Sequence, residues 1–351
     1  MADELRTEAA YPSPETGSSG FADVETPAAP CTRLLCAAPW TPPGSAVQEL
    51  LQGRRDWLTR HALGGVRTAL LHTSGWLLRW FEGTAFAVEA EWQRLRADPA
   101  CRQLRVLHCS EGRPLLGPAV QVVSVHGGDS GTAFVRRMQA VEREGAQGLR
   151  VDPIDVWHAL GAPAAAALPG TVGLIARRDV VVMGSEDNEA VDVIRLLAQV
   201  SGDCVVYQRY AGSAPERGDV GAAYVDVSME RSLATRVHAL PRRAPGPGCT
   251  LLGLRNVQCV VLLLGAHVQR SRVAVLEAMR VMASLPLVPA VVVASRCPDI
   301  SDAAVAALSQ MEGLAVSCTE LARPPRASAA LLWQLLESGN GAGQWSVRPR
   351  G

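Results

Sequence analysis

The sequence predicts an α/β protein with two domains: an α+β, ferredoxin-like amino-terminal domain and a doubly wound, mostly parallel α/β carboxyl-terminal domain. The chain has 351 residues, which is enough for two domains that each bury a hydrophobic core. Its 48% hydrophobic and 19% charged residues are typical of a folded globular protein. Short hydrophobic strands also alternate with amphipathic helices along most of the chain, as in α/β folds.

The amino-terminal domain is expected at residues 31–150, after a disordered tail at residues 1–30 that carries six acidic residues and one arginine. Its elements follow the order strand, helix, strand, strand, helix, strand, which predicts the ferredoxin-like arrangement. A tight turn at Ser74-Gly75 joins the two middle strands into a hairpin. The expected strands are Arg33–Ala37, Arg67–His72, Trp76–Phe81 and Leu104–Cys109, and the expected helices are Ala46–His61 and Ala85–Arg96.

The carboxyl-terminal domain is expected at residues 171–340, between an Ala/Pro linker at 151–170 and a flexible tail at 341–351. Continuous Val, Ile and Leu runs between helices predict strands that are buried on both faces of a parallel sheet. The expected strands are Asp179–Met183, Cys204–Gln208, Ala222–Val227, Cys259–Leu264, Ala290–Ala294 and Leu314–Cys318. The expected helices are Asp187–Val200, Arg270–Ala283, Ser301–Met311 and Ala327–Glu337.

The composition argues against several classes of function. All 34 basic residues are arginine, so no lysine is present for Schiff-base chemistry or for a lysine-dependent phosphate loop. The formal net charge of zero argues against a nucleic-acid partner. The nine cysteines form no CxxC pair and the seven histidines show no metal-ligand spacing, so neither a disulfide framework nor a metal site is expected. Without a signal peptide or a long apolar run, the chain is expected to be cytoplasmic and to have no membrane partner.

One stretch of the first domain carries a family resemblance. The sequence Ala69-Leu-Leu-His-Thr-Ser-Gly-Trp-Leu-Leu-Arg-Trp-Phe-Glu-Gly83, followed by a helix and by Asp98-Pro99, resembles the BLUF family of flavin photoreceptor domains over roughly residues 32–125. The resemblance implies a ferredoxin-like fold and a bound flavin, with a Tyr and a Gln hydrogen-bonded around the isoalloxazine ring.

The flavin-contacting positions of this resemblance hold other residues. The Tyr position corresponds to Cys36, the Gln position to Arg79, and the later Trp and Met positions to Pro118 and Val120. No Tyr occurs between residues 12 and 206, so no shift of the alignment supplies one. The sequence therefore predicts a degenerate BLUF-like domain that has lost the flavin photochemistry, and no cofactor is expected.

The second domain resembles a Ras-type small GTPase in the order of its elements. The resemblance implies a GxxxxGK[ST] loop after the first strand, whose backbone amides and Lys hold phosphates. If this loop starts at Gly184, its second Gly is Asn188, its Lys is Glu189 and its Ser/Thr is Ala190. A Glu in place of the Lys would repel the phosphates.

The later nucleotide motifs of this resemblance are also replaced. Asp226 stands where a DxxG motif is expected, but the Gly is missing. Ser295 and Arg296 stand where the guanine-reading Asn and Lys are expected, and Asp299 is one residue late. Phosphate hydrolysis with magnesium is therefore not expected. Another doubly wound fold, such as a receiver or flavodoxin-like domain, remains an alternative.

Two further patterns have both structural and functional interpretations. Trp76, Leu78 and Trp80 share one face of a strand and form either core or a patch for a protein partner. Gly128-Asp-Ser-Gly131 is similar to the sequence around a trypsin-like nucleophile, but capping of the following helix explains it better.

These observations favour a non-catalytic regulatory or scaffold protein that acts through protein partners or self-association. No catalytic residue is expected. The first alternative is a nucleotide-binding switch protein of GTPase-like fold. The second is a flavin-binding light or redox sensor with an altered pocket near Cys36.

Overall fold

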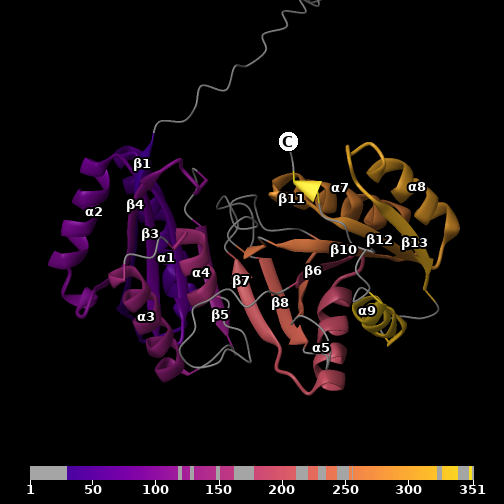
Figure 1. Cartoon of the computed structure of the whole chain (residues 1–351), viewed down its shortest axis with the longest axis horizontal. Coiled ribbons are helices and arrows are strands. Elements are labelled where there is room, and N and C mark those ends of the chain that lie inside the picture. Colours follow the sequence, from indigo (N-terminus) through magenta and orange to yellow (C-terminus); the bar gives the residue numbers. More distant parts are fainter. Residues whose placement is uncertain are drawn as a thin grey trace, which may run out of the picture.

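The computed structural model describes residues 30–117, 121–126, 130–147, 151–161, 178–210, 220–227, 235–242, 253–254, 256–321, 326–338 and 348–349. These residues form a mixed α/β fold built on one twelve-stranded sheet (Figure 1). The larger helices are α1 (Ala46–Gly64), α2 (Ala85–Ala97), α3 (Gly131–Ala146), α4 (Pro153–Gly161), α5 (Glu189–Ser201), α7 (Val268–Ser284), α8 (Pro298–Leu308) and α9 (Arg326–Ser338).

The strands of the first half are β1 (Cys31–Pro39), β2 (Arg67–Thr73), β3 (Trp76–Gly83), β4 (Arg105–Gly112) and β5 (Gln121–His126). They lie in the order β4-β1-β3-β2-β5, with antiparallel neighbours except for the parallel pair β2 and β5. The expected hairpin is confirmed: Ser74 and Gly75 have φ values of 51° and 77°, the left-handed backbone of a two-residue turn between twisted strands.

The strands of the second half are β6 (Arg178–Gly184), β7 (Val206–Tyr210), β8 (Val220–Val227), β9 (Thr235–Leu240), β10 (Val257–Leu264), β12 (Ala290–Ser295) and β13 (Val316–Glu320). Strands β9, β6, β10, β12 and β13 are parallel neighbours in that order, and β8 and β7 continue the sheet beside β9 as antiparallel strands. A separate ribbon joins β11 (Leu287–Val288) to β14 (Arg348–Pro349).

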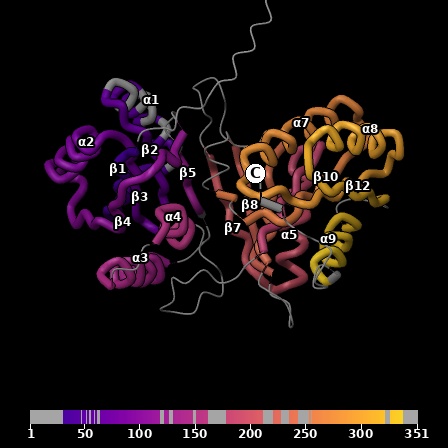
Figure 2. Tube along the Cα trace, turned by 45° about the horizontal axis from the view of Figure 1, so that its top comes forward, coloured from indigo at the N-terminus to yellow at the C-terminus, as the bar shows by residue number. Residues whose placement is uncertain are grey.

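The two halves share the sheet because β5 pairs with β7 in antiparallel register, with Val125 opposite Gln208. The sequence predicts two domains with separate cores, whereas the structure has one sheet through both. Helices α3, α4, α7 and α8 cover one face, called here the first face, and α1, α2, α5 and α9 cover the second face (Figures 1 and 2).

The core of the first face is continuous from one half to the other. A single cluster of buried side chains includes Trp80 and Phe134 of the first half and Tyr224, Leu262 and Met282 of the second. On the second face the buried side chains form separate clusters under α2, under α1, and under α5 with α9. Only the first face therefore has a core that joins the halves.

Strands β5, β11 and β14 were not expected from the sequence, and two further regions also differ from the expectation. Helix α4 occupies Pro153–Gly161, where a linker was expected, because Val156, Trp157 and Leu160 bury an apolar stripe against the sheet. The rest of that linker lies outside the described residues, as do residues 1–29 and most of the carboxyl-terminal tail. Strand β9 was not expected at all, since its buried Arg236 interrupts the hydrophobic run that marks the other central strands.

Candidate functional sites

The Glu-Gly pair of the BLUF resemblance has a structural role. The Glu82 side chain is fully buried, and its Oε2 accepts hydrogen bonds from the backbone N–H groups of Leu115 (2.7 Å) and Leu116 (2.8 Å). Its Oε1 lies 3.6 Å from Nε of Arg33. The carboxylate thus fixes the segment after β4 to the end of β3, because buried backbone amides need an acceptor.

Its neighbour Gly83 and the Asp98-Pro99 pair are also explained by packing. A Cβ at Gly83 would lie 3.0 Å from the backbone oxygen of Gly65, so a larger residue would require the neighbouring backbone to shift. Asp98 accepts the backbone N–H of Ala100 at 2.8 Å and ends α2, while Pro99 opens a short 3₁₀ turn. These motif residues shape the chain without touching a ligand site.

The two flavin-contacting positions, Cys36 and Arg79, lie directly opposite each other on β1 and β3. The Cys36 thiol is fully buried on the second face, and burial raises its pKa to about 12, so it stays neutral. The charge of the Arg79 guanidinium lowers the pKa of the same thiol, but by less than burial raises it. Nη1 of Arg79 is buried with no hydrogen-bond partner among the described residues.

These two residues do not fit the flavin chemistry that the resemblance implies. A thiol replaces the phenol, and a guanidinium, which only donates hydrogen bonds, replaces an amide that donates and accepts. Pro118 and Val120, the other positions named for the flavin site, lie outside the described residues. We therefore derive no step through a flavin.

The loop after β6 corresponds to the expected phosphate loop of the second half. Asn188, at the place of the second Gly, has a left-handed φ of 65°, as a Gly there would. A Cβ at Gly184 would lie 3.3 Å from Oε2 of Glu189, so the Glu189 side chain folds back over the start of the loop. The Ser185 hydroxyl accepts the Gly265 backbone N–H at 2.7 Å and is fully buried.

The Glu189 carboxyl occupies the position where an anion would have to enter this loop. Burial, followed by the charge of Glu186, raises the pKa of Glu189 to about 7, while Arg296 and a hydrogen bond from the backbone of Glu186 lower it. Its Oε2 is buried without a hydrogen-bond partner among the described residues. The Glu189 carboxyl group therefore lies against the backbone of its own loop, at Gly184 and Glu186.

Arginines from other elements neutralise the acidic residues of the same loop. Arg270 of α7 bonds Glu186 at 2.5 Å, and Nη2 of Arg242, after β9, lies 3.5 Å from Asp187. Sequence analysis missed these two arginines, which are far away in the chain and belong to no recognised motif. Both guanidinium groups are thus paired with carboxylates of the loop itself.

The structure brings together only part of the predicted nucleotide positions. Gly184 and Ser295 both end parallel strands at the same edge of the sheet, and Asp299 lies in the first turn of α8. The Ser295 hydroxyl accepts the Cys297 backbone N–H at 3.1 Å, so it caps its own loop.

Asp226 was grouped with these positions, and that grouping is wrong. It lies on antiparallel β8 opposite Arg236, which itself pairs with Asp179 at the amino end of β6, the end remote from Gly184. Arg236 donates to both carboxylate oxygens of Asp226, at 2.7 and 2.8 Å, and lies 3.9 Å from the centre of the Tyr224 ring. Although burial opposes it, Tyr224 and Asp226 raise the pKa of Arg236, so the pair is a charged element of the core.

The tryptophan face proposed as an interaction surface is core. Leu78 and Trp80 are fully buried on the first face, where Trp80 packs on Trp157 of α4 at 5.9 Å between ring centroids. Trp76 packs on Phe134 of α3 at 5.8 Å. Leu78 and Trp80 are therefore core residues, and Trp76 is partly buried against the same core.

Ser130 caps α3 as expected, since its hydroxyl accepts the Ala133 backbone N–H at 3.2 Å. In the part of the chain that the structure describes, no three His, Cys, Asp or Glu side chains are grouped to hold a metal. No described helix is long and apolar enough to cross a membrane.

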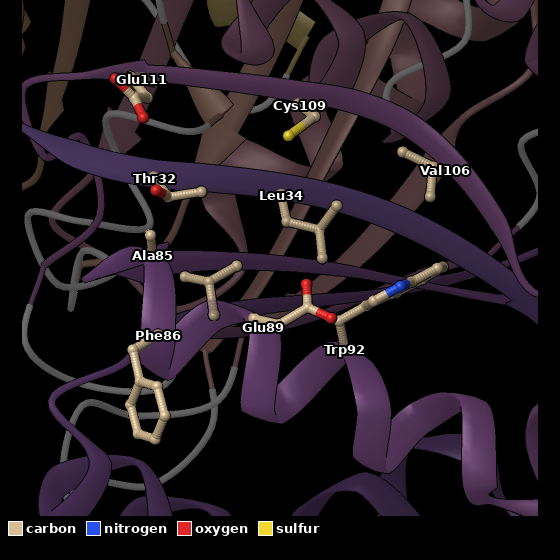
Figure 3. A pocket seen from close by; sticks show the side chains of 10 residues that line it. Thr32, Leu34, Ala85, Phe86, Glu89, Trp92, Val106, Cys109 and Glu111 are labelled. Carbon is tan, nitrogen blue, oxygen red and sulfur yellow. The ribbon is translucent and has the colours of Figure 1, made fainter.

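An open groove of about 670 Å³ lies on the second face beside β4. Figure 3 shows its lining: Thr32 and Leu34 on β1, Val106, Cys109 and Glu111 on β4, and Ala85, Phe86, Val88, Glu89 and Trp92 on α2. Sequence analysis did not identify this groove, because it depends on which strand ends the sheet.

Comparisons with known proteins give weak likenesses. No family model matches the chain, and no curated protein matches it. Similar solved structures include BlrB, a BLUF protein in its dark state, with 18% identity over 27% of this chain and 72% of that one and a TM-score of 0.25. BlsA in its ground state gives 17% identity over 35% of this chain and 89% of that one, with a TM-score of 0.23.

A third structure is longer. A calcium and cyclic-di-GMP complex of Klebsiella pneumoniae BlrP1 gives 13% identity over 82% of this chain and 74% of that one, with a TM-score of 0.26. All these TM-scores are low, so these likenesses carry no argument about the function of this chain.

Proposed function

We propose that the chain is a non-catalytic regulatory protein that acts through protein–protein contacts. In this proposal its first half is a BLUF-like, ferredoxin-like unit without flavin photochemistry. Its second half is a doubly wound unit that resembles a small GTPase and has no working phosphate loop. The observation that carries the proposal is the Glu189 carboxyl, which lies over Gly184 inside the loop where a phosphate would bind.

The strand orders support the two resemblances. In the first half, β4-β1-β3-β2 with antiparallel neighbours is the order of a split βαβ unit. In the second half, five parallel strands with helices on both faces and antiparallel strands beside β9 agree with a doubly wound domain of small-GTPase type.

Electrostatics supports the absence of nucleotide binding. Glu186, Asp187 and Glu189 place carboxyl groups around the loop, and Glu186 and Asp187 already pair with arginines of the chain. A phosphate would have to displace these groups or lie against them, and like charges in a partly buried site repel strongly. The loop is therefore stabilised by ion pairs with arginines of the same chain.

The test is to identify small molecules released from freshly purified, heat-denatured chain by liquid chromatography with absorbance and fluorescence detection. The same protein is titrated with magnesium and GDP or GTP in a calorimeter. We expect no stoichiometric flavin or nucleotide and no heat of binding. A stoichiometric nucleotide would overturn the proposal for the second half and favour the switch protein. A stoichiometric flavin would overturn it for the first half and favour the sensor.

A further inference from the structure

Strand β4 leaves one edge of the twelve-stranded sheet open. Within the described residues it pairs with β1 alone, and it stands last in the strand order. Beside this edge Phe86 and Val106 are 86% and 44% exposed, and Cys109 is exposed as well. An open strand edge with apolar side chains is a template for pairing with another strand.

A bulge gives β4 an unusual order of faces. The register with β1 shifts between Leu35 and Cys36, so that Cys109 lies opposite Leu34 and Val106 lies opposite Cys36. Leu34 and Cys36 belong to the same buried cluster on the second face. Val106 and Cys109 therefore point to the same face although they are three residues apart, which a regular strand does not allow.

The residues between them complete the pattern. Leu107 packs in the continuous core of the first face, and His108 lies opposite Leu35, which packs in the same core. Farther out, Arg105 lies opposite Ala37 of the same core, and Ser110 lies opposite Arg33, two residues before Leu35. Both therefore point to the first face. From Arg105 to Ser110 the side chains therefore point to the first, second, first, first, second and first face. This order is the same in both directions along β4, with its centre between Leu107 and His108.

From this symmetry we infer that β4 pairs antiparallel with β4 of a second copy of the chain, about a two-fold axis between Leu107 and His108. In this register Val106 lies opposite the partner's Cys109, and Arg105 lies opposite the partner's Ser110. Residues that face each other then point to the same side throughout, without a further bulge. A regularly alternating partner strand would match these faces only with a further bulge in the pairing, as β1 does, so the face pattern favours a second copy over an unrelated strand.

The pairing explains the exposed side chains. It continues the sheet across the axis and covers Val106 and Cys109 with their counterparts, and it joins the two grooves on the second face. This inference names one partner for the protein-contact role and rests on that role. A dimer that carried a bound nucleotide would overturn the role and leave the dimer in place, so the two failures are distinguishable.

The first measurement is the mass of the full chain in solution by sedimentation or light scattering, over a range of concentrations. We expect a species of twice the 37.2 kDa chain mass. A chain that stays monomeric at the highest concentrations overturns the inference.

The second measurement locates the interface by cross-linking. In Val106→Cys the new thiol would lie opposite the partner's Cys109, at a spacing that a disulfide can bridge. With oxidised glutathione as oxidant, we expect a covalent dimer that Cys109→Ser abolishes. The matched control is Val268→Cys on α7, which is equally conservative and 71% exposed. Dimers that form as readily in the control, or only through other cysteines, would place the interface elsewhere and overturn the inference.

The third measurement separates pairing from folding. The double variants Val106→Glu with Cys109→Glu, and Val106→Lys with Cys109→Lys, each place like charges opposite one another across the axis. Each alone should be monomeric with wild-type circular dichroism, and a one-to-one mixture should regain the dimer mass. A mixture of folded variants that stays monomeric would refute the two-fold register.

Discussion

The two resemblances in the sequence, to BLUF domains in the first half and to small GTPases in the second, rest on different features. The first half keeps motif residues, and Glu82, Gly83 and Asp98 each have a packing or hydrogen-bonding reason to be there. The resemblance of the second half rests only on the order of its elements, since Asn188, Glu189 and Ala190 differ from the residues that a phosphate loop would have. A motif can thus be present because it shapes the chain, so its presence alone does not indicate flavin chemistry.

The candidate sites differ in the same way. In the first half, Cys36 has a neutral thiol, and Arg79 has a guanidinium nitrogen, Nη1, that is buried without an acceptor among the described residues. At Glu189 the second half has an acidic group inside a loop that would favour an anion. Among the described residues, the first site thus has one guanidinium nitrogen without an acceptor, whereas the loop of the second half holds its own carboxyl group over Gly184.

The largest expected effect is the loss of the Glu82 carboxylate. Glu82→Ala leaves two buried backbone amides without an acceptor and Arg33 without its ion pair, so we expect the free energy of unfolding to fall by about 3–5 kcal/mol. Urea unfolding followed by circular dichroism measures it. The control Glu111→Ala removes an exposed carboxylate and should change stability by less than about 0.5 kcal/mol. Equal losses in the two variants would show that the motif has no structural role.

A second prediction tests whether the halves behave as one unit. Val125 is buried on β5 at the junction with β7, and Val125→Ala should lower the free energy of unfolding by roughly 2 kcal/mol. Because the core of the first face is continuous, tryptophan fluorescence, which reports chiefly on the first half, and labelling of the fully buried Cys259 thiol in the second should shift together. Val268→Ala, on an exposed helix position, should shift neither. Separate transitions would show that each half has its own core.

Local features of the fold could be predicted from the sequence. Ser74-Gly75 encodes its turn through two residues that tolerate positive φ, and alternating apolar residues mark β3. Strand β9 could not be predicted, because the partner that makes the buried Arg236 tolerable, Asp226, is supplied by tertiary structure.

The candidate sites were less predictable than the fold. The acidic group in the loop after β6 could be predicted from the sequence, since the position of Glu189 in this loop is set locally. The prediction placed Asp226 at the wrong end of the sheet because it did not include strand β9. In the structure β8 runs antiparallel to β9, so Asp226 lies near the amino end of β6. The groove beside β4 and the β5–β7 junction depend on pairings between distant segments, for which a single sequence carries no local signal.

A third prediction concerns pH. Burial raises the pKa of Glu189 from its ordinary 4.5 to about 7, so the folded chain binds this proton more tightly than the unfolded chain. The free energy of unfolding should therefore fall as the pH rises from about 4.5 to about 7 and stay lower above that. Glu189→Gln should remove this fall, which amounts to at most about 3 kcal/mol and less because water reaches part of the side chain. Urea unfolding at several pH values measures it, with Glu312→Gln, an exposed position, as the control. A parallel pH profile for wild type and Glu189→Gln would contradict the buried position of this carboxyl.

The smallest expected effect is at Arg79, and it has the opposite sign. Arg79→Met keeps the apolar stem and removes a guanidinium whose Nη1 is buried without a partner, so we expect the free energy of unfolding to rise by about 1 kcal/mol. The control Arg94→Met removes a guanidinium that bonds Glu91, and it should lose up to about 1 kcal/mol instead. Urea unfolding of the two variants side by side measures both. If Arg79→Met were destabilised like the control, the Arg79 guanidinium would have a hydrogen-bond acceptor of its own, and its Nη1 would not be unpartnered in the folded chain.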